Sequence, residues 1–244
     1  MTVPVAPHPP LTEYYSDAAH REEYVRDIFD HTAPWYDWAT QFLSFGSGDW
    51  YRREALRRIG LAPGMKILDL ASGTGPVARV AAEITKDARA VVGIDPSIGM
   101  LRSGKTSNAK VQAPAERIPL RDASVDRISI GFAMRHFSDL DVVFRECRRV
   151  LKPGGRLLIM EITTPESRLA RAFLGVYMGK FVPAAVRVRT RSARAAELFR
   201  YYWETTRDCV RPDVIMDAMR AAGFSDVKRG VELGIFSEYS GTAS

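Results

Sequence analysis

The chain has 244 residues, of which 46% are hydrophobic and 26% charged, and its formal net charge is +6. This length and composition suit one large α/β domain and exclude a disordered or low-complexity protein. Two cysteines, Cys147 and Cys209, exclude a disulfide framework and favour a cytoplasmic protein, and four histidines without i, i+4 pairing predict no metal site.

The first sixty residues divide into two parts. Residues 1–20 contain no Lys or Arg and are rich in proline, so they lack the features of a signal peptide, and we expect a disordered tail. Residues 21–60 interleave aromatic and aliphatic residues with charges, which predicts a helical N-terminal cap. The longest apolar stretch of the chain, residues 172–186, is interrupted by Lys180 and Pro183, so no membrane-spanning helix is predicted.

Short apolar runs alternate with helical segments over residues 61–164. The expected strands are residues 66–70, 90–94, a short one near 111, 125–131 and 156–162, and the expected helices are residues 76–84, 98–103 and 139–150. This alternation favours parallel pairing with right-handed crossovers in a doubly wound sheet. The Lys-Pro-Gly-Gly sequence at 152–155 ends one helix and turns the chain into the next strand.

The alternation ends after the fifth expected strand. Residues 165–207 predict a helical insertion, which we interpret as a lid. Residues 208–244 predict a helix at 212–222, capped by Gly223, followed by hairpin strands at 226–233 and 235–240. The sequence therefore predicts one α/β domain over residues 21–244, with a seven-stranded, mostly parallel sheet.

The basic surplus of the chain is concentrated in the insertion. Residues 166–200 contain eight Lys or Arg and two Glu, a net charge of +6 that equals that of the whole chain. This segment is either a solvated helical face or a surface for an anionic membrane or an acidic partner. No nucleic-acid-binding motif accompanies the charge, so we expect no nucleic-acid partner. A homodimer stays open.

A glycine-rich loop follows the first core strand and leads into a helix, with the sequence Asp69-Leu70-Ala71-Ser72-Gly73-Thr74-Gly75. Glycines let a ligand approach the backbone, and the free N–H groups at the helix start bind its polar groups. The spacing Gly73-x-Gly75-x-x-Ala78, with Asp95 further on, also fits a dinucleotide site. The Asp69 carboxylate suits an ammonium group better than a pyrophosphate, which favours a different cofactor.

Together with the 152–155 turn, these features resemble the class I S-adenosylmethionine-dependent methyltransferases over residues 61–161. The resemblance implies a Rossmann-like methyltransferase fold and S-adenosyl-L-methionine as the cofactor. It assigns the methionine part of the cofactor to Asp69 and the glycine loop, and the ribose hydroxyls to Asp95. The cofactor-binding residues that it implies are Tyr36, Asp69, Ala71, Gly73, Gly75, Asp95, Pro96, Ala115 and Glu116.

A narrower resemblance rests on segments inside and outside this core. Tyr36-Asp37, Leu43-Ser44-Phe45-Gly46, residues 111–116, Gly131-Phe132-Ala133-Met134-Arg135 and Glu161 look like the ubiquinone/menaquinone biosynthesis C-methyltransferase family. That family implies methyl transfer to a ring carbon of a polyprenylated quinol, a hydrophobic small-molecule acceptor met at a membrane surface. The chain departs from the family pattern at Thr40, Gly48, Asp49, Pro114 and His136. An O- or N-methyltransferase of a secondary metabolite or a phospholipid amine is therefore the alternative.

The expected chemistry singles out Arg135 and His136 as candidate catalytic residues. A phenol resembling tyrosine has a pKa near ~10, so ionising it at neutral pH costs about 4 kcal/mol. The charge of Arg135 would lower that cost, and His136 would accept the proton. In the alternative interpretation Arg135 pairs with a carboxylate such as Glu161 or Asp37 and stabilises the fold, and His136 is a packing residue.

Overall fold

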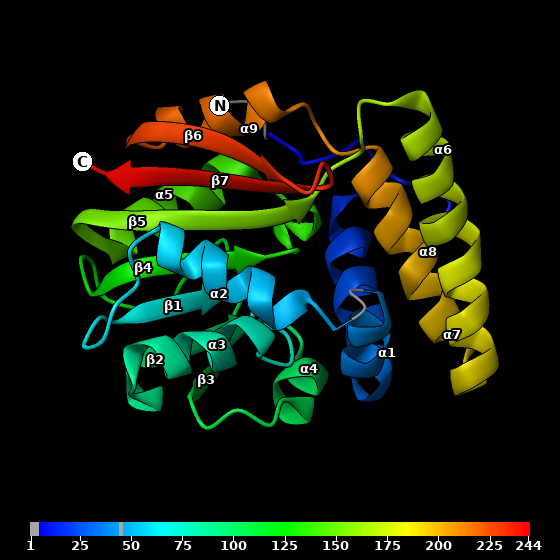
Figure 1. Cartoon of the computed structure of the whole chain (residues 1–244), viewed down its shortest axis with the longest axis horizontal. Helices are drawn as coiled ribbons and strands as arrows, with labels where there is room; N and C mark the ends of the chain where they lie inside the picture. Colours follow the sequence, from blue (N-terminus) through cyan, green and yellow to red (C-terminus); the bar gives the residue numbers. More distant parts are fainter. Residues whose placement is uncertain (1–4, 44–45) are drawn as a thin grey trace.

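The computed structural model describes residues 5–43 and 46–244 of the chain. In this part a single sheet runs in the order β3-β2-β1-β4-β5-β7-β6 (Figure 1). Strands β1 to β5 pair in parallel, and β7 lies antiparallel between β5 and β6. The strands are β1 (Ile67–Leu70), β2 (Val91–Asp95), β3 (Ala109–Gln112), β4 (Val125–Gly131), β5 (Leu151–Ile162), β6 (Phe224–Glu232) and β7 (Phe236–Ala243).

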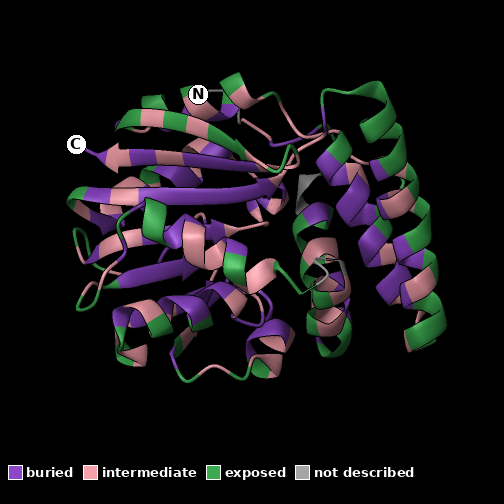
Figure 2. Cartoon of the chain, in the orientation of Figure 1, coloured by how far each residue is buried: buried purple, intermediate pink, exposed green. Residues whose placement is uncertain are grey.

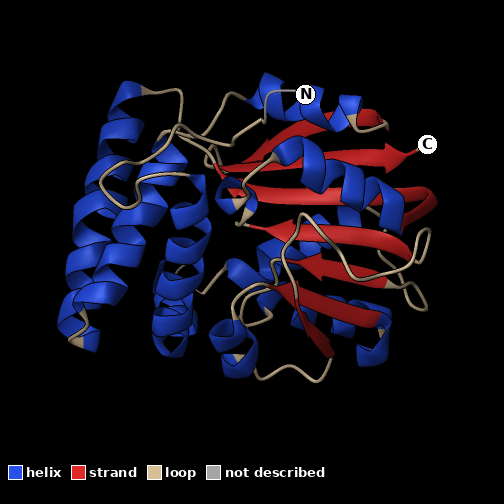
Figure 3. Ribbon diagram, turned by 180° about the vertical axis from the view of Figure 1, so that it is seen from behind, coloured by secondary structure: helices blue, strands red, loops and turns tan. Residues whose placement is uncertain are grey.

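The helices occupy both faces of the sheet and one of its ends (Figures 1 and 3). The α-helices are α1 (Ala18–Leu43), α2 (Gly48–Arg58), α3 (Pro76–Thr85), α4 (Ile98–Ser103), α5 (Leu140–Val150), α6 (Arg168–Val176), α7 (Val182–Thr190), α8 (Ala193–Arg207) and α9 (Pro212–Ala221). Two 3₁₀ turns, η1 (Ala88–Ala90) and η2 (Met134–His136), and a π-helical turn, η3 (Tyr177–Phe181), complete the regular structure. The doubly wound, mostly parallel sheet is confirmed.

One strand begins earlier than the sequence predicts. We expected β5 to start at Arg156, but Leu151 already pairs with Val125 on β4. The register then shifts, and Arg156 pairs with Arg127. The Lys-Pro-Gly-Gly sequence therefore forms a bulge within the strand rather than a turn before it, since proline and two glycines tolerate the loss of ladder hydrogen bonds.

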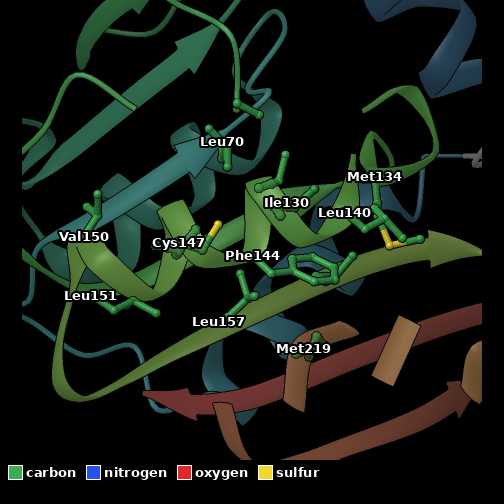
Figure 4. Packing of buried hydrophobic residues seen from close by; sticks show 14 of the residues in the cluster. Leu70, Ile130, Met134, Leu140, Phe144, Cys147, Val150, Leu151, Leu157 and Met219 are labelled. Carbon is green, nitrogen blue, oxygen red and sulfur yellow. The ribbon is translucent and has the colours of Figure 1, made fainter. Parts of the chain in front are cut away.

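Two hydrophobic clusters hold the helices against the sheet. Helix α5 buries one stripe at three- and four-residue spacing, which packs with α9 against one face (Figure 4). Figure 4 shows Phe144 and Cys147 of this stripe beside Leu157 of β5. Helices α2 and α3 pack against the other face. Because both faces are covered, the central strands carry many buried aliphatic residues, such as Leu68, Ile128, Ile130 and Leu157, as is typical of parallel sheets.

The third group of helices forms a layer at the carboxyl ends of the parallel strands (Figure 1). Helix α1 contacts α7 and α8, and the segment α6–η3–α7 packs on α8. Their shared core includes Ala39, Leu174, Val186 and Phe199. The helical insertion after the fifth strand is therefore confirmed, and it joins α1 in one layer. Its movement as a lid stays a prediction.

The N-terminal residues differ from the disordered tail that we expected. Residues 5–17 pack on the domain: Leu140 N donates to Val5 O at 3.0 Å, and Val210 N donates to Pro7 O at 2.8 Å. The His8 side chain is buried. The prolines of this segment suggested a disordered tail, but proline also fixes an extended conformation that suits a strap across neighbouring elements. Pro4 and the residues before it lie outside the described part.

By length and composition alone, the continuous helical stretch Arg168–Thr190 would be able to cross a membrane, and only 28% of its most apolar window is buried within the protein. We did not expect such a segment, because Lys180 and Pro183 interrupt it. The structure accommodates both: Lys180 lies in the π-helical turn, and Pro183 lies in the first turn of α7. Proline is tolerated in the first turn of a helix, because the N–H that it lacks would have no acceptor within that helix.

Candidate active site

A cavity of about 560 Å³ lies between the carboxyl ends of β1, β2 and β4 and the layer formed by α1 and α6–η3. This is the edge at which ligands bind in open α/β sheets. Apolar groups line most of it, with a few polar groups from the strand ends. This composition is typical of small-molecule sites.

The glycine loop forms the floor of the cavity. Gly73 and Gly75 have φ of +56° and +88°, a left-handed conformation that a side chain would strain. Asp69, at the end of β1, accepts hydrogen bonds from Ala78 N at 3.0 Å and Ser129 Oγ at 2.9 Å. Burial raises the pKa of its carboxyl to about 7. A cationic group bound beside Asp69 would favour the ionised carboxylate, so this residue fits an ammonium group.

Asp95 ends β2 and lies across the loop from Asp69. Its two carboxylate oxygens accept hydrogen bonds from Gly73 N and Ser97 N, both at 2.8 Å. Burial raises the pKa of this carboxyl to about 6. Each oxygen keeps a second lone pair, so Asp95 can still accept hydrogen bonds from two vicinal hydroxyls. The same residue thus shapes the glycine loop and offers acceptors to a ligand.

Helix α1 is tied to the loops that form the cofactor side of the cavity. Thr74 Oγ1, in the glycine loop, donates to the Asp37 carboxylate. The Asp30 carboxylate accepts from Gly99 N at 2.8 Å and from Ser97 Oγ. Asp37, which the narrower resemblance singled out, therefore fixes the glycine loop. Tyr36, the preceding residue, lines the cavity. Ser44 and Phe45 of that resemblance lie outside the described residues.

The remaining cofactor-binding predictions lie along the same wall. Ala71, Pro96 and Ala115 line the cavity, and so does Glu116, whose Oε1 accepts from Ser138 N at 2.9 Å and Ser138 Oγ at 2.6 Å. Of the nine residues expected to bind the cofactor, all but Gly75 line this cavity. Gly75 instead caps the N-terminus of α3. The residues that are present therefore fit S-adenosylmethionine.

His136 lies in the cavity wall, away from the glycine loop. Its ring is buried, meets Phe29 edge-on at 5.2 Å between centroids, and stacks on Tyr201 at 5.5 Å. Within the described residues neither ring nitrogen has a hydrogen-bond partner. Burial, and then the Arg135 charge, lower the pKa of the imidazole well below its usual value. The ring is therefore neutral at pH 7, and its unprotonated nitrogen is free to accept a hydrogen bond from a ligand.

Arg135 is not where an acceptor-binding role requires it. Its guanidinium lies behind the cavity wall, 1% exposed, paired with the Glu161 carboxylate and bonded to Thr205 Oγ1 at 3.1 Å. It also lies 3.7 Å from the centre of the Tyr202 ring. The 3₁₀ turn η2 directs Arg135 and His136 to different sides, so only His136 reaches the cavity. We predicted Arg135 beside the reacting oxygen; the structure places it in a buried ion pair, the alternative interpretation.

Several wall residues escaped the sequence analysis. Arg52 lies near Asp69 with a side chain that is 13% exposed, and it would suit the carboxylate of the expected cofactor. Phe132 has φ of +61°, a strained conformation for an aromatic residue. Tyr51 and Phe236 stack at 4.7 Å beside it. Helix α2 contains several charged residues, and its sequence alone does not show which of them faces the cavity. Arg52 was missed for this reason.

The fold and the site define an S-adenosylmethionine-dependent methyltransferase. The glycine loop after β1, the carboxylate ending β2 and the antiparallel β7 inserted beside β5 belong to the class I architecture. The family model of the ubiE/COQ5 methyltransferase family matches residues 17–242, and the chain belongs to that family. This membership confirms the methyltransferase prediction and the family resemblance.

Relatives of known name agree with this assignment. The chain is 33% identical over 220 residues to the ubiquinone/menaquinone biosynthesis C-methyltransferase UbiE of Shewanella frigidimarina, covering 86% of each chain. It is 33% identical over 229 residues to the protein of the same name from Geobacter sulfurreducens, covering 90% of this chain and 88% of that one.

Solved structures share the fold at lower identity. A possible histamine N-methyltransferase from Thermotoga maritima aligns with TM-score 0.62 at 21% identity, over 90% of this chain and 99% of that one. The [4+2]-cyclase SpnF aligns with TM-score 0.63 at 16% identity, over 97% and 98% of the two chains. These two names describe different reactions, so the shared fold does not by itself identify the acceptor.

Proposed function

We propose that this methyltransferase transfers a methyl group to a ring carbon of a polyprenylated benzoquinol or naphthoquinol. One observation carries the proposal: a neutral, buried imidazole without a hydrogen-bond partner among the described residues faces an otherwise largely apolar cavity. A phenolic hydroxyl would satisfy that imidazole. The named relatives act in ubiquinone and menaquinone biosynthesis, which supports a quinol as the acceptor.

The cofactor wall positions the methyl donor. Bound S-adenosylmethionine supplies an electrophilic methyl group on a sulfonium. Asp69 would hold the cationic amino group, Asp95 the ribose hydroxyls, and Glu116 with Ala115 and Pro96 the adenine end of the site. The glycine loop holds the cofactor's polar groups at the helix N-terminus. This positioning is the main contribution of the protein, because an aligned donor and acceptor lower the entropic part of the barrier.

His136 would activate the acceptor. A ring nitrogen of His136 accepts the proton of the quinol hydroxyl, which raises electron density on the neighbouring ring carbon. That carbon forms the new bond to the methyl group as the bond from methyl to sulfur breaks, which gives a dienone. The same carbon then loses its ring proton, which is released to solvent after the transfer, and His136 returns its proton to the oxygen, so the aromatic quinol is restored with a net release of one proton. Phe29 and Tyr36, which line the cavity, would limit the access of water to this step. Arg135 would act only through the position of the η2 turn.

The test is product analysis with purified protein. The protein is incubated with isotopically labelled S-adenosylmethionine and a demethylated quinol, and the labelled carbon is located by mass spectrometry and NMR. We expect a ring C-methyl product. The His136→Asn variant should bind the cofactor normally and lose about 10²-fold or more in kcat, the usual size of a general-base effect. An O-methyl product, or a His136→Asn variant of normal turnover, would contradict the proposal.

We also propose that the outer face of α6 and α7 rests on an anionic membrane. Much of the outer face of α6 and α7 is exposed (Figure 2). Large apolar side chains contribute to it, among them Leu169 at 84%, Phe173 at 72% and Val188 at 81% exposed. Arg168, Lys180 and Arg187 alternate with them along the helices. An amphipathic surface with this pattern binds anionic lipid headgroups. Arg194 does not contribute, since it pairs with Asp27 and Glu197.

Vesicle co-sedimentation tests this face. Wild-type protein should bind vesicles containing anionic lipid, and binding should weaken with salt, because exposed charges are screened beyond about 10 Å at 0.1 M ionic strength. The Phe173→Ser variant should bind less. Equal binding to neutral and anionic vesicles, or none to either, would count against the proposal. Formation of a homodimer is a separate proposal. Analytical ultracentrifugation tests it by measuring the molecular mass of the protein in solution.

A further inference from the structure

A second hollow lies on the surface between α1 and α7, outside the cavity described above. We call it the α1–α7 groove; it has a volume of about 710 Å³ and is lined by Trp38, Phe42, Phe181, Ala184, Ala185, Val188, Arg189 and Arg191. Its walls are apolar except for the two arginines. Arg189 lies 5.7 Å from the centre of the Trp38 ring.

A row of stacked aromatic rings joins this groove to the cavity. Tyr177, which lines the cavity, stacks on Phe181 at 5.8 Å between centroids. Phe181 stacks on Phe42 at 6.5 Å, and Phe42 on Trp38 at 5.6 Å. The two sites therefore meet along this row: Tyr177 lines the cavity, and Phe181, on which it stacks, lines the groove.

The π-helical turn η3 produces this alignment. Its wider turn places Tyr177 and Phe181 one above the other, with ring planes only 19° apart. Gly179, in the same turn, lies against Trp203 of α8, where an added Cβ would come within 2.9 Å of the indole. The small residue lets η3 lie close to α8 while its aromatic side chains face α1. Such turns are frequent at functional sites.

We infer that the α1–α7 groove binds the long apolar tail of the methyl acceptor, which leaves the cavity over the row Tyr177, Phe181, Phe42 and Trp38. The inference rests on the proposed function, since it names a second part of the same acceptor. An apolar chain is the occupant that the groove favours, because most of its lining side chains are aromatic or aliphatic and would bury hydrocarbon. Exposed aromatic surface that continues from a ligand cavity is otherwise costly to leave in water.

The experiment compares two acceptors that share one quinol ring, one with a long isoprenoid tail and one with a methyl group in its place. Binding is measured by calorimetry and turnover by product formation, for wild type, Ala184→Trp and Val188→Asp. Ala184 and Val188 are exposed, so neither change disturbs the core. Ala221→Trp, an exposed position on α9, is the matched control for added bulk. The affinity of each variant for S-adenosylmethionine is measured as well, to check that the variant is folded.

We expect both groove variants to lower affinity and kcat/KM for the tailed acceptor by about tenfold, which corresponds to losing contact with on the order of 55 Å² of apolar surface. The methyl-substituted acceptor, and both acceptors with Ala221→Trp, should be unaffected. Equal losses with both acceptors, or none, would overturn the inference. If the variants keep full discrimination between the two acceptors, the inference is wrong, whether or not Val188→Asp weakens vesicle binding through the membrane-facing surface.

The proposed function and the groove fail separately in this design. In one outcome neither acceptor is methylated, yet the tailed acceptor binds more tightly and loses that advantage in Ala184→Trp. This result would support the groove assignment and contradict the proposed quinol chemistry. If both acceptors are methylated and the tail has no effect on binding, the result supports the proposed chemistry and contradicts the groove assignment.

Discussion

The buried ion pair between Arg135 and Glu161 allows a sharp test of what Arg135 does. Arg135 is 1% exposed and the Glu161 side chain 5% exposed. Burial raises the pKa of the Glu161 carboxyl, although the Arg135 charge beside it favours ionisation. The Arg135→Ala variant would leave this carboxylate unpaired in the core, which costs about 3–5 kcal/mol. For a domain of this size that loss lowers Tm by roughly 6–20 °C.

The assay is thermal unfolding alongside turnover and cofactor binding. A double variant, Arg135→Met with Glu161→Leu, removes both charges at similar volume and should recover most of the lost stability. Arg220→Ala, which breaks an exposed ion pair with Asp217, is the matched control and should lower Tm by no more than about 4 °C. Turnover of Arg135→Ala should fall only in step with its folded fraction. An unchanged Tm with abolished turnover would refute this reasoning and return Arg135 to the chemistry.

Three further outcomes follow from the site and its supports. Asp95→Ala should weaken S-adenosylmethionine binding by roughly 1.5–3 kcal/mol in calorimetry, the scale for hydrogen bonds to a charged group, and an unchanged affinity would remove Asp95 from the site. Because burial raises the pKa of Asp69 to about 7 and that of Asp95 to about 6, the cofactor-free protein should lose stability as pH rises from about 4 to about 7. Cofactor affinity should rise over the same range, since the bound cation favours ionised Asp69; a flat titration would contradict this. Gly179→Ala should lower stability by about 1–3 kcal/mol through its contact with Trp203, whereas Gly230→Ala, with open space around it, should change little in the same unfolding assay.

The core of the fold could be predicted from the sequence because its signals are local. Helix α4 (Ile98–Ser103) has the predicted bounds, and the alternation of apolar runs with helices determines the parallel order. The start of β5 was missed because Pro153 and the glycines after it are typical of a turn. The sequence does not reveal that the strand continues through them as a bulge.

In the candidate site, too, the residues grouped by local sequence were predictable, and those placed by distant contacts were not. The glycine loop and Asp95 occur in one short segment with fixed spacing, so their grouping was predictable. The direction of Arg135 was not, because it depends on a 3₁₀ turn of three residues and on Glu161, which lies 26 residues further along the chain. Arg52 and the strap formed by residues 5–17 depend on tertiary contacts that no local pattern encodes.

The position of β7 has a consequence for how the protein is made. Residues 236–243 are synthesised after every other element described, yet they pair with both β5 and β6 inside the sheet. Until they leave the ribosome, β5 has an unpaired edge beside an apolar run, Leu157–Met160. Such an edge is a template for association with other chains. We therefore expect a nascent or truncated chain without residues 236–243 to aggregate more readily than the chain in which β7 covers the edge of β5.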